Sequence, residues 1–326
     1  MPGNPSSSQT HVNSMLTNIS VAYIQDQSDF IADKVFPIVP VEKQSDRYFV
    51  YNKDDWFRDE AQLRAPGTES AGGGYDIDNT PSYYCNKYAW HQDVSDDDRE
   101  NNDDPLKPDE DATAFCTQKL LIKRETLWQS KYFKTGIWGS DYTGGSTKSG
   151  TQLYYWSDTA NGTPIINIRN AKTDVKESTG YDPNTLVLGR DVFDVLCDHP
   201  VVLERIKYSQ KAVVTTDLLA SLFDIPRVLV ANAVVNTAYK GATASNSFVF
   251  GKGALLCYSA PKPGLRVPSA GYTFAWNGLL GAGAYGNRVK NFRMENLESD
   301  RIEAEMAFDQ KVVGSDLGCF FSGIVE

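Results

Sequence analysis

Cysteine and histidine are the side chains best suited to act as nucleophiles, bases or metal ligands, and this chain has few of them. The five cysteines and three histidines are scattered, and no Cys-x-x-Cys pair occurs. An odd number of dispersed cysteines favours free thiols in a reducing compartment over disulfides or a zinc site. The GxxxxGK[ST], HExxH and GxSxG patterns are also missing from the sequence. We therefore expect no catalytic, cofactor or metal site, and no enzyme.

Three other patterns indicate ligands, but each lacks the context that its ligand needs. Gly281, Gly283 and Gly286 have the spacing of a dinucleotide fingerprint, yet strand-like sequence follows them, which favours a hinge. The acidic run 93–111 has no central glycine, which favours a solvated connector over an EF-hand calcium site. Residues 216–227 resemble a helix-turn-helix with a single arginine nearby, and a packed helical hairpin is the better interpretation.

Length and composition indicate a globular protein of two or three domains. The chain has 326 residues, a hydrophobic content of 41% and a formal net charge of -10. Such an acidic balance argues against a protein that grips nucleic acid along a basic face, but not against a container around nucleic acid. No apolar run is long enough to span a membrane, and the N-terminus lacks the features of a signal peptide.

One long helix is predicted over residues 109–133. The segment contains no glycine or proline, begins with an acidic turn and is ended by Gly136. A helix of this length must lie across a wide partner. We expect two apolar stripes to be buried. The first contains Ala112, Phe115, Cys116, Leu120, Ile122 and Leu127, and the second contains Leu121, Trp128 and Tyr132.

The segment before this helix predicts a projecting hairpin. Strands at 46–51 and 82–90 carry aromatic side chains on both faces, and a long connection with little core material separates them. Lys53 is the only lysine in the body of this loop. A two-stranded ribbon is marginal alone in water, so its cover should come from another copy of the chain, or else from its own domain.

Residues 30–41 predict an extended apolar ribbon. Pro37 and Pro40 disfavour a regular helix here. The ribbon must lie either on its own core or on a neighbouring subunit.

The rest of the chain predicts an α/β subdomain inserted between the long helix and a small antiparallel sheet. Thr163 and Pro164 should begin a helix that ends at Gly180. The expected strands lie at 185–189, 227–235, 248–259, 264–276, 288–296, 301–313 and 317–325, and the expected helices at 190–199, 200–208 and 216–223. The last three strands should form the sheet beneath the long helix, which makes the chain an α+β protein.

Two stretches resemble the major capsid proteins of tailed bacteriophages, the Hong Kong 97-type capsid fold family. They are FIADKVFPIVPVEKQSDRYFVYNKDDWFRDEAQLRAPGTESAGGGY at 30–75 and PNTLVLGRDVFDVLCDHPVVLERIKY at 183–208. The long helix before Trp138 fits the spine helix of that family, and the resemblance covers nearly the whole chain.

The resemblance implies a fold in which a spine helix crosses an antiparallel sheet, the P-domain, beside an inserted α/β A-domain, with an extended E-loop hairpin and an N-terminal arm. The implied ranges are 1–45 for the arm, 46–93 for the E-loop, 94–140 with 286–326 for the P-domain around spine helix 109–133, 141–182 for a connecting loop and helix, and 183–275 for the A-domain. No long, charged, coiled segment precedes the arm, so we expect a fused scaffolding domain to be absent or already removed. Some members crosslink Lys to Asn between subunits, and no motif here decides whether Lys53 does so.

The implied function is assembly. The chain would form hexamers and pentamers of an icosahedral head around double-stranded DNA, with portal, scaffolding and decoration proteins as further partners, in the virion and, during assembly, in the host cytoplasm. No cofactor, membrane or sequence-specific DNA contact is expected. The expected contacts between subunits are Trp56, Phe57, Arg58, Arg64, Pro66 and Gly67 of the E-loop and Phe36 and Ile38 of the arm. An encapsulin-like compartment, a phage tail-tube protein and an orphan hydrolase are the alternatives.

Overall fold

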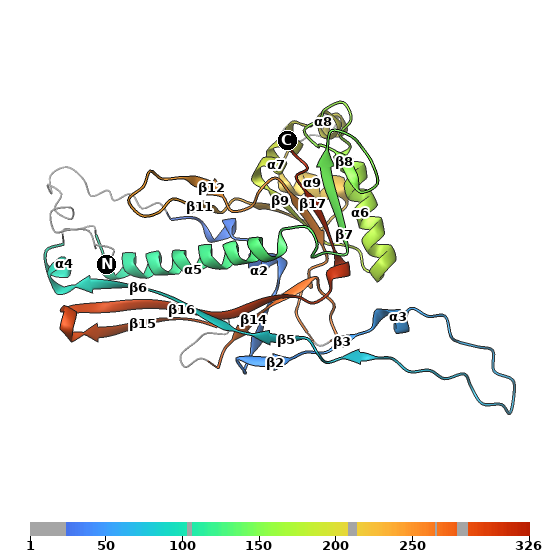
Figure 1. Cartoon of the computed structure of the whole chain (residues 1–326), viewed down its shortest axis with the longest axis horizontal. Coiled ribbons are helices and arrows are strands. Elements are labelled where there is room, and N and C mark those ends of the chain that lie inside the picture. The colour runs from blue at the N-terminus through green and yellow to red at the C-terminus, as the bar shows by residue number, and fades with distance from the viewer. Residues whose placement is uncertain (1–23, 103–105, 208–213, 265, 279–285) are drawn as a thin grey trace.

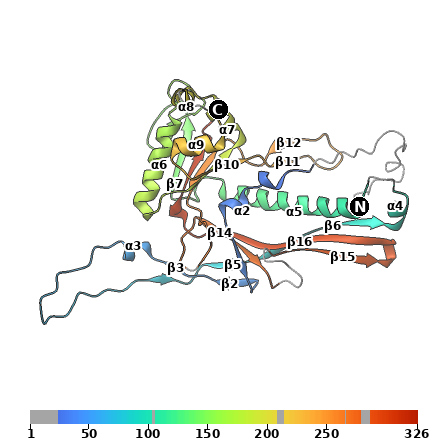
Figure 2. The same ribbon diagram turned by 180° about the vertical axis from the view of Figure 1, so that it is seen from behind.

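Two β-sheets and one long helix form the body of the molecule (Figure 1). The computed structural model describes residues 24–102, 106–207, 214–264, 266–278 and 286–326. A five-stranded sheet lies along helix α5, and a six-stranded sheet carries the shorter helices. We call these the spine half and the six-stranded half. A hairpin extends from the body on the side away from the N-terminal end of α5, as the reverse view in Figure 2 also shows. The predicted α+β class is confirmed.

Helix α5 spans Pro108–Tyr132, 25 residues, and confirms the predicted spine helix. Its second expected stripe is buried at Trp128 and Tyr132 and partly buried at Leu121. The first stripe is wrong at Phe115, whose ring is exposed and lies 5.1 Å from the Lys119 ammonium group. The buried positions of α5 are Ala112, Cys116, Leu120, Glu125, Trp128 and Tyr132.

β16 (Ser299–Val312) is the central strand of the five-stranded sheet. Three strands pair with it in antiparallel register, and β1 lies parallel to β14. Their bounds are Ile38–Val41 for β1, Asn86–Ser95 for β6, Gly271–Trp276 for β14 and Asn287–Met294 for β15. The buried core between helix and sheet contains Cys116 and Leu120 of α5 and Ala304, Met306 and Phe308 of β16. The predicted helix across an antiparallel sheet is confirmed.

The second sheet has the strand order β10-β9-β13-β17-β7-β8. Its strands are β7 Ser140–Gly145, β8 Gln152–Tyr154, β9 Thr185–Gly189, β10 Arg227–Ala231, β13 Ala254–Cys257 and β17 Gly318–Ser322. Its helices are α6 Pro164–Thr179, α7 Arg190–Asp198, α8 Pro200–Ile206 and α9 Thr216–Phe223. Helix α6 begins at Pro164 and ends before Gly180 at φ 74°, which confirms the helix that these two residues predicted.

Two strands belong to a different half of the molecule from the one that the implied domain ranges assign to them. β14 falls almost entirely within 183–275, yet it pairs with β16 of the spine half. β17 falls within 286–326, yet it lies between β13 and β7 of the six-stranded half. A buried strand of either sheet has the same apolar pattern, so the sequence pattern does not distinguish the two sheets.

The remaining elements are short. β11 (Val234–Asn236) and β12 (Asn246–Phe248) form a hairpin that lies on the same side of the five-stranded sheet as α5 in Figures 1 and 2. Single 3₁₀ turns occur at Gln27–Asp29 (η1), Glu295–Leu297 (η2) and Ser315–Leu317 (η3).

The arm lies against its own chain. The arm was expected to span residues 1–45, and residues 1–23 of it lie outside the described residues. Helix α2 (Ala32–Val35) and strand β1 replace the continuous extended ribbon that Pro37 and Pro40 predicted. Proline disfavours helical backbone at the residue before it. The single turn of α2 ends at Val35, two residues before Pro37, so the proline does not disturb it.

Phe36 of the arm corrects one expected contact. Its side chain is fully buried, and its ring centroid lies 5.4 Å from that of Trp128 and 5.1 Å from that of Tyr132. We expected Phe36 to contact a neighbouring subunit, but a side chain without exposed surface packs only within its own chain. Ile38 is partly buried in β1.

The acidic segment 93–111 is bound to the sheet by ion pairs. It forms the end of β6 and helix α4 (Asp96–Glu100). The Arg99 guanidinium donates to Asp109 at 2.8 Å and to Asp300 of β16 at 2.9 Å. The expectation of a merely solvated connector is therefore wrong for this part of the segment.

A buried carboxyl group holds the arm on the spine helix. Glu125 of α5 accepts hydrogen bonds from the backbone N–H groups of Ile31 at 2.9 Å and Ala32 at 3.0 Å, where α2 begins. The adjacent Arg124 forms an ion pair with Asp33 at 2.5 Å. Burial raises the pKa of Glu125 to about 7, although the two N–H donors favour the ionised form.

We expect Glu125→Gln to change how stability depends on pH. The folded chain binds a proton with a pKa of about 7, whereas the ordinary value is 4.5. The stability from this group is therefore fully present below the lower value and is lost as pH rises through the higher one. Glutamine does not titrate, so this loss, on the order of 2 kcal/mol, should disappear.

Denaturant unfolding of unassembled subunits at about pH 5 and pH 8 measures the effect. Asp111→Asn, which removes an exposed carboxyl group from the same helix, is the matched control and should keep the wild-type profile. A Glu125→Gln profile equal to the wild-type profile would contradict the prediction.

Candidate assembly interface

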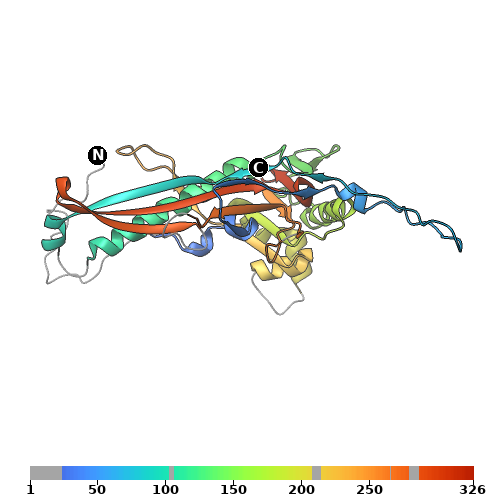
Figure 3. The ribbon, with the colours of Figure 1, turned by 90° about the horizontal axis from the view of Figure 1, so that it is seen from below.

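The expected E-loop is a hairpin that leaves the body (Figure 3). β2 (Ser45–Arg47) pairs with β5 (Ser82–Tyr84), and β3 (Val50–Tyr51) pairs with β4 (Ile77–Asp78). Helix α3 (Lys53–Trp56) follows β3, and the chain between it and β4 has no further helix or strand. The first expected strand, 46–51, is divided into β2 and β3. The second, 82–90, is divided into β5 and the beginning of β6, which pairs with β16 of the five-stranded sheet. The predicted projection is observed.

The base of the hairpin is attached to the six-stranded half. The Lys53 ammonium group forms an ion pair with Asp316, which precedes β17. The Phe57 ring lies over Gly180 at the end of α6, where an added Cβ atom would sit 3.4 Å from the ring. These contacts fix the direction in which the loop leaves the body.

Beyond this attachment, the aromatic side chains of the hairpin contact one another more than the core. The ring centroid of Trp56 lies 6.3 Å from that of Tyr51 and 5.5 Å from that of Tyr75. Trp56 is nevertheless 60% exposed and Phe57 58% exposed. Indole and phenyl groups with that much exposed surface form an apolar patch of the kind that marks an interaction site.

The middle of the loop is a tight turn. Pro66 and Gly67 are its central residues, Gly67 has φ 81°, and the Thr68 N–H closes the turn, as expected for a type II turn. The Arg64 Nε donates to the Thr68 carbonyl at 2.6 Å. Leu63 beside this turn is completely exposed.

The eight expected contact residues therefore separate into three places. Trp56, Phe57 and Arg58 lie near the base of the hairpin, where Arg58 pairs with Asp55 at 3.4 Å. Arg64, Pro66 and Gly67 form the turn, and Phe36 and Ile38 belong to the body. The hairpin exposes five further large apolar side chains that the residue-by-residue prediction did not name, although their types alone would have indicated them: Phe49, Leu63, Tyr75, Ile77 and Tyr84.

The titratable groups of the described residues were also compared with known kinds of site. No group of three or more His, Cys, Asp or Glu side chains there is arranged to hold a metal ion. Burial raises the pKa of the Cys85 and Cys257 thiols to about 12, which keeps them uncharged. No helix among these residues combines the length and apolar character of a membrane span.

Two sequence patterns that suggested ligands remain, namely the helix-turn-helix-like segment 216–227 and the glycine-rich segment 281–286. Helix α9 is followed by strand β10, so residues 216–227 form neither a helix-turn-helix nor the helical hairpin expected from the sequence. Gly281 and Gly283 lie outside the described residues, and Gly286, at φ 66°, directly precedes β15.

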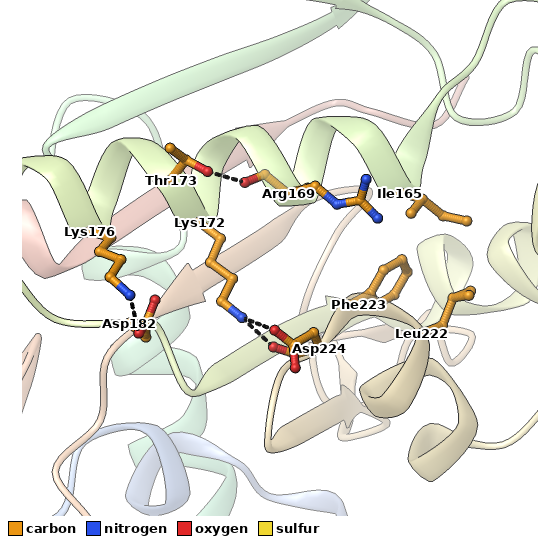
Figure 4. A pocket seen from close by; sticks show the side chains of 9 residues that line it. All are labelled: Ile165, Arg169, Lys172, Thr173, Lys176, Asp182, Leu222, Phe223 and Asp224. Atoms are coloured by element: carbon orange, nitrogen blue, oxygen red, sulfur yellow. Dashed lines mark hydrogen bonds and ion pairs between the residues drawn. The ribbon is translucent and has the colours of Figure 1, made fainter.

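A hollow beside α6 is lined by charged groups that pair with one another (Figure 4). Lys172 Nζ lies 2.6 Å from Asp224, and Lys176 Nζ lies 2.7 Å from Asp182. These carboxylates neutralise the two lysines, and the Arg169 guanidinium is the remaining cation of the lining. The projecting hairpin is therefore the stronger candidate site.

Sequence comparisons give two curated relatives of nearly full length. The major capsid protein of Burkholderia phage BcepMu is 26% identical over 327 residues, which cover 96% of each chain. The major capsid protein of Pseudomonas phage JBD67 is 25% identical over 316 residues, 95% of this chain and 96% of the relative. No protein-family model matches the chain.

Solved structures share the fold over almost the whole chain. A phage-related protein from Bordetella bronchiseptica gives a TM-score of 0.68 at 21% identity, covering 92% of this chain and 93% of the other. The capsid of cyanophage P-SCSP1u gives 0.59 at 10% identity over 100% of both chains. The SrpI encapsulin of Synechococcus elongatus gives 0.53 at 10% identity, covering 96% and 94%. The chain is thus similar over nearly its whole length to two phage major capsid proteins, and its fold is the Hong Kong 97-type capsid fold that the sequence predicted.

Proposed function

We propose that this chain is the major capsid protein of a tailed phage and builds an icosahedral head from hexamers and pentamers. The observation that carries the proposal is the nearly full-length similarity to two major capsid proteins, combined with a hairpin whose large apolar side chains are mostly exposed in the described part of the chain. A structural capsid role explains both, because a shell subunit completes its packing only beside its copies.

The hairpin is proposed to lie over the spine half of an adjacent subunit. Trp56, Phe57 and Arg58 would contact the neighbour near the hairpin base, and Arg64, Pro66 and Gly67 would contact it further out. Covering a large apolar side chain contributes about 1.5–3 kcal/mol, so one such contact is weak. Repeated by symmetry around a closed shell, many such contacts hold it together.

The proposed partners follow from this role. They are other copies of the chain, a portal, scaffolding or decoration proteins, and packaged double-stranded DNA without sequence-specific binding. Assembly would take place in the cytoplasm of the host. The net charge of -10 supports an inner wall that does not hold DNA tightly.

An encapsulin-like compartment is the main alternative, because the SrpI encapsulin shares the fold. The sequence relatives favour the phage head, since both are named major capsid proteins. DNA inside particles purified from infected cells would support the head, and protein cargo in its place would support the compartment. Tubes seen by negative-stain microscopy would support a tail-tube protein.

We expect Trp56→Ala to reduce shell formation without unfolding the subunit. The indole group is 60% exposed, so its loss removes little from the core of the isolated chain. In the shell the same change should remove roughly 1.5–3 kcal/mol from each contact, a factor of about ten or more.

The yield of closed shells, measured by sedimentation and negative-stain microscopy, tests this expectation. Phe115→Ala, which removes another exposed ring, is the matched control and should assemble normally. Wild-type yields for Trp56→Ala would argue against the interface, and a lowered unfolding temperature would assign the loss to the subunit.

We also expect trypsin to distinguish free from assembled subunits. Arg58 and Arg64 are exposed in the isolated chain, so cleavage after them should be rapid before assembly and at least about tenfold slower within a shell. Arg64→Gln removes one cleavage site and identifies its fragment by mass. Equal cleavage rates in both states would mean that neighbours do not cover the loop.

A further inference from the structure

The chain contains two Asn-Gly pairs, Asn161-Gly162 and Asn277-Gly278. In such a pair the backbone nitrogen of the glycine can attack the side-chain amide carbon of the asparagine, because glycine has no Cβ atom to hinder the approach. The reaction needs no enzyme and no cofactor, and it is one reason why asparagine is a thermally labile residue. It does need a backbone that can bring the two groups together. The surroundings of each pair therefore decide whether that pair reacts.

The reaction has two steps. In the first, hydroxide removes the amide proton of the glycine, and the nitrogen bonds to the Cγ atom of the asparagine. The bond from Cγ to the side-chain nitrogen breaks, and that nitrogen leaves as ammonia after taking a proton from water. In the second step, water opens the resulting five-membered succinimide ring. Opening at Cγ gives aspartate, and opening at the main-chain carbonyl gives isoaspartate, so water is the only co-reactant and nothing is oxidised or reduced.

The first pair is held closed by its own turn. The Gly162 N–H donates to the Asp158 carbonyl at 2.8 Å, and the Asn161 side-chain amide donates to the Asp158 carboxylate at 2.9 Å. This side-chain hydrogen bond lowers the pKa of Asp158, so the acceptor stays ionised. Gly162 is buried, and a Cβ atom added to it would lie 2.5 Å from the Asp158 carbonyl oxygen. Attack on Asn161 would require these hydrogen bonds to break within closely packed surroundings.

The second pair lies in an exposed turn directly after β14. Both Asn277 and Gly278 are exposed, and the Asn277 N–H donates to the Val41 carbonyl at 2.9 Å. Among the described residues, no hydrogen bond is found for the Asn277 side chain or for the Gly278 N–H. Within the described part of the chain, the two reacting groups of this pair thus lack the contacts that hold the first pair closed.

Packing requires glycine at position 278 for a reason unrelated to the reaction. A Cβ atom there would lie 2.5 Å from Trp276 Nε1 and 2.6 Å from the Glu42 carbonyl oxygen. These two atoms form a hydrogen bond of 2.9 Å, which connects the end of β14 to the chain that enters the projecting hairpin. A residue with a side chain would separate them, so the reactive pair is a consequence of how this corner is packed.

We propose that Asn277 is a site of spontaneous modification in the folded subunit, where it converts to aspartate and isoaspartate through a succinimide, while Asn161 is protected. This inference goes beyond the proposed capsid function and does not depend on it. Each conversion adds a negative charge beside the backbone of Val41 and Glu42, where β1 leads into the hairpin. Isoaspartate also inserts an extra atom into the main chain before Gly278, which disturbs the close contact of that glycine with Trp276.

Peptide mapping by mass spectrometry tests the proposal within a single molecule. Full-length subunits are incubated at physiological temperature and mildly alkaline pH, and the converted fraction at each asparagine is followed with time. Conversion replaces an NH₂ group by an OH group, which changes the peptide mass, and chromatography separates aspartate from isoaspartate. The same incubation in strong denaturant gives the rate of each pair without structure, and it continues until both pairs have converted there.

We expect Asn277 to convert at least about tenfold faster than Asn161 in the folded chain, because the first pair must open locally before it reacts. In denaturant the two rates should be similar, since both asparagines precede glycine. Asn277→Gln should remove the acidic species that isoelectric focusing detects in aged wild-type protein, because glutamine would have to form a larger ring. Asn161→Gln is the matched control and should leave the rate at Asn277 unchanged.

Three results would overturn the inference. Equal rates at the two asparagines in the folded chain would show that the turn at Asn161 gives no protection. Conversion of Asn277 in denaturant but not in the folded chain would show that the turn after β14 holds the second pair closed. Persistence of the acidic species in aged Asn277→Gln protein would place the modification elsewhere in the chain.

Discussion

A single aromatic cluster at the C-terminal end of α5 joins the parts of this molecule. Phe36 of the arm packs on Trp128, and Trp128 packs on Phe250 of the six-stranded half at a ring-centroid distance of 5.6 Å. Phe133 continues the cluster to Phe320 of β17 at 5.0 Å. Because arm, spine helix and both sheets meet here, the relative placement of the halves depends on this packing.

The apolar side chains of the chain consequently have two different roles. Those of the arm, Phe36 in particular, are covered within one subunit and contribute to its own stability. Those of the hairpin, Trp56 and Leu63 among them, remain mostly or wholly exposed among the described residues. A subunit of this kind can fold first and assemble afterwards, because removing the hairpin contacts does not expose the core. The attachment of Lys53 to Asp316 keeps the unassembled hairpin pointing outward.

Sequence reasoning succeeded where local chemistry decides the structure. The bounds of α5 follow from its acidic first turn and Gly136, and those of α6 from Pro164 and Gly180. It failed where the partner of a residue lies far away in the sequence. The sheet membership of β14 and β17, and the buried position of Glu125 under the arm, depend on tertiary contacts that periodicity does not encode.

The same distinction holds for the candidate interface. The projection of the hairpin could be predicted, since a long connection poor in core residues has nothing of its own to pack on. The apolar type of residues 30–41 was equally clear, but whether Phe36 packs within the chain or on a neighbour could not be decided from type alone. The most direct measurement is a cryo-EM structure of the assembled particle. We predict Trp56 and Leu63 within about 4.5 Å of a sister subunit and Phe36 within its own chain. A hairpin lying on its own body, or exposed to solvent in the finished shell, would contradict this account.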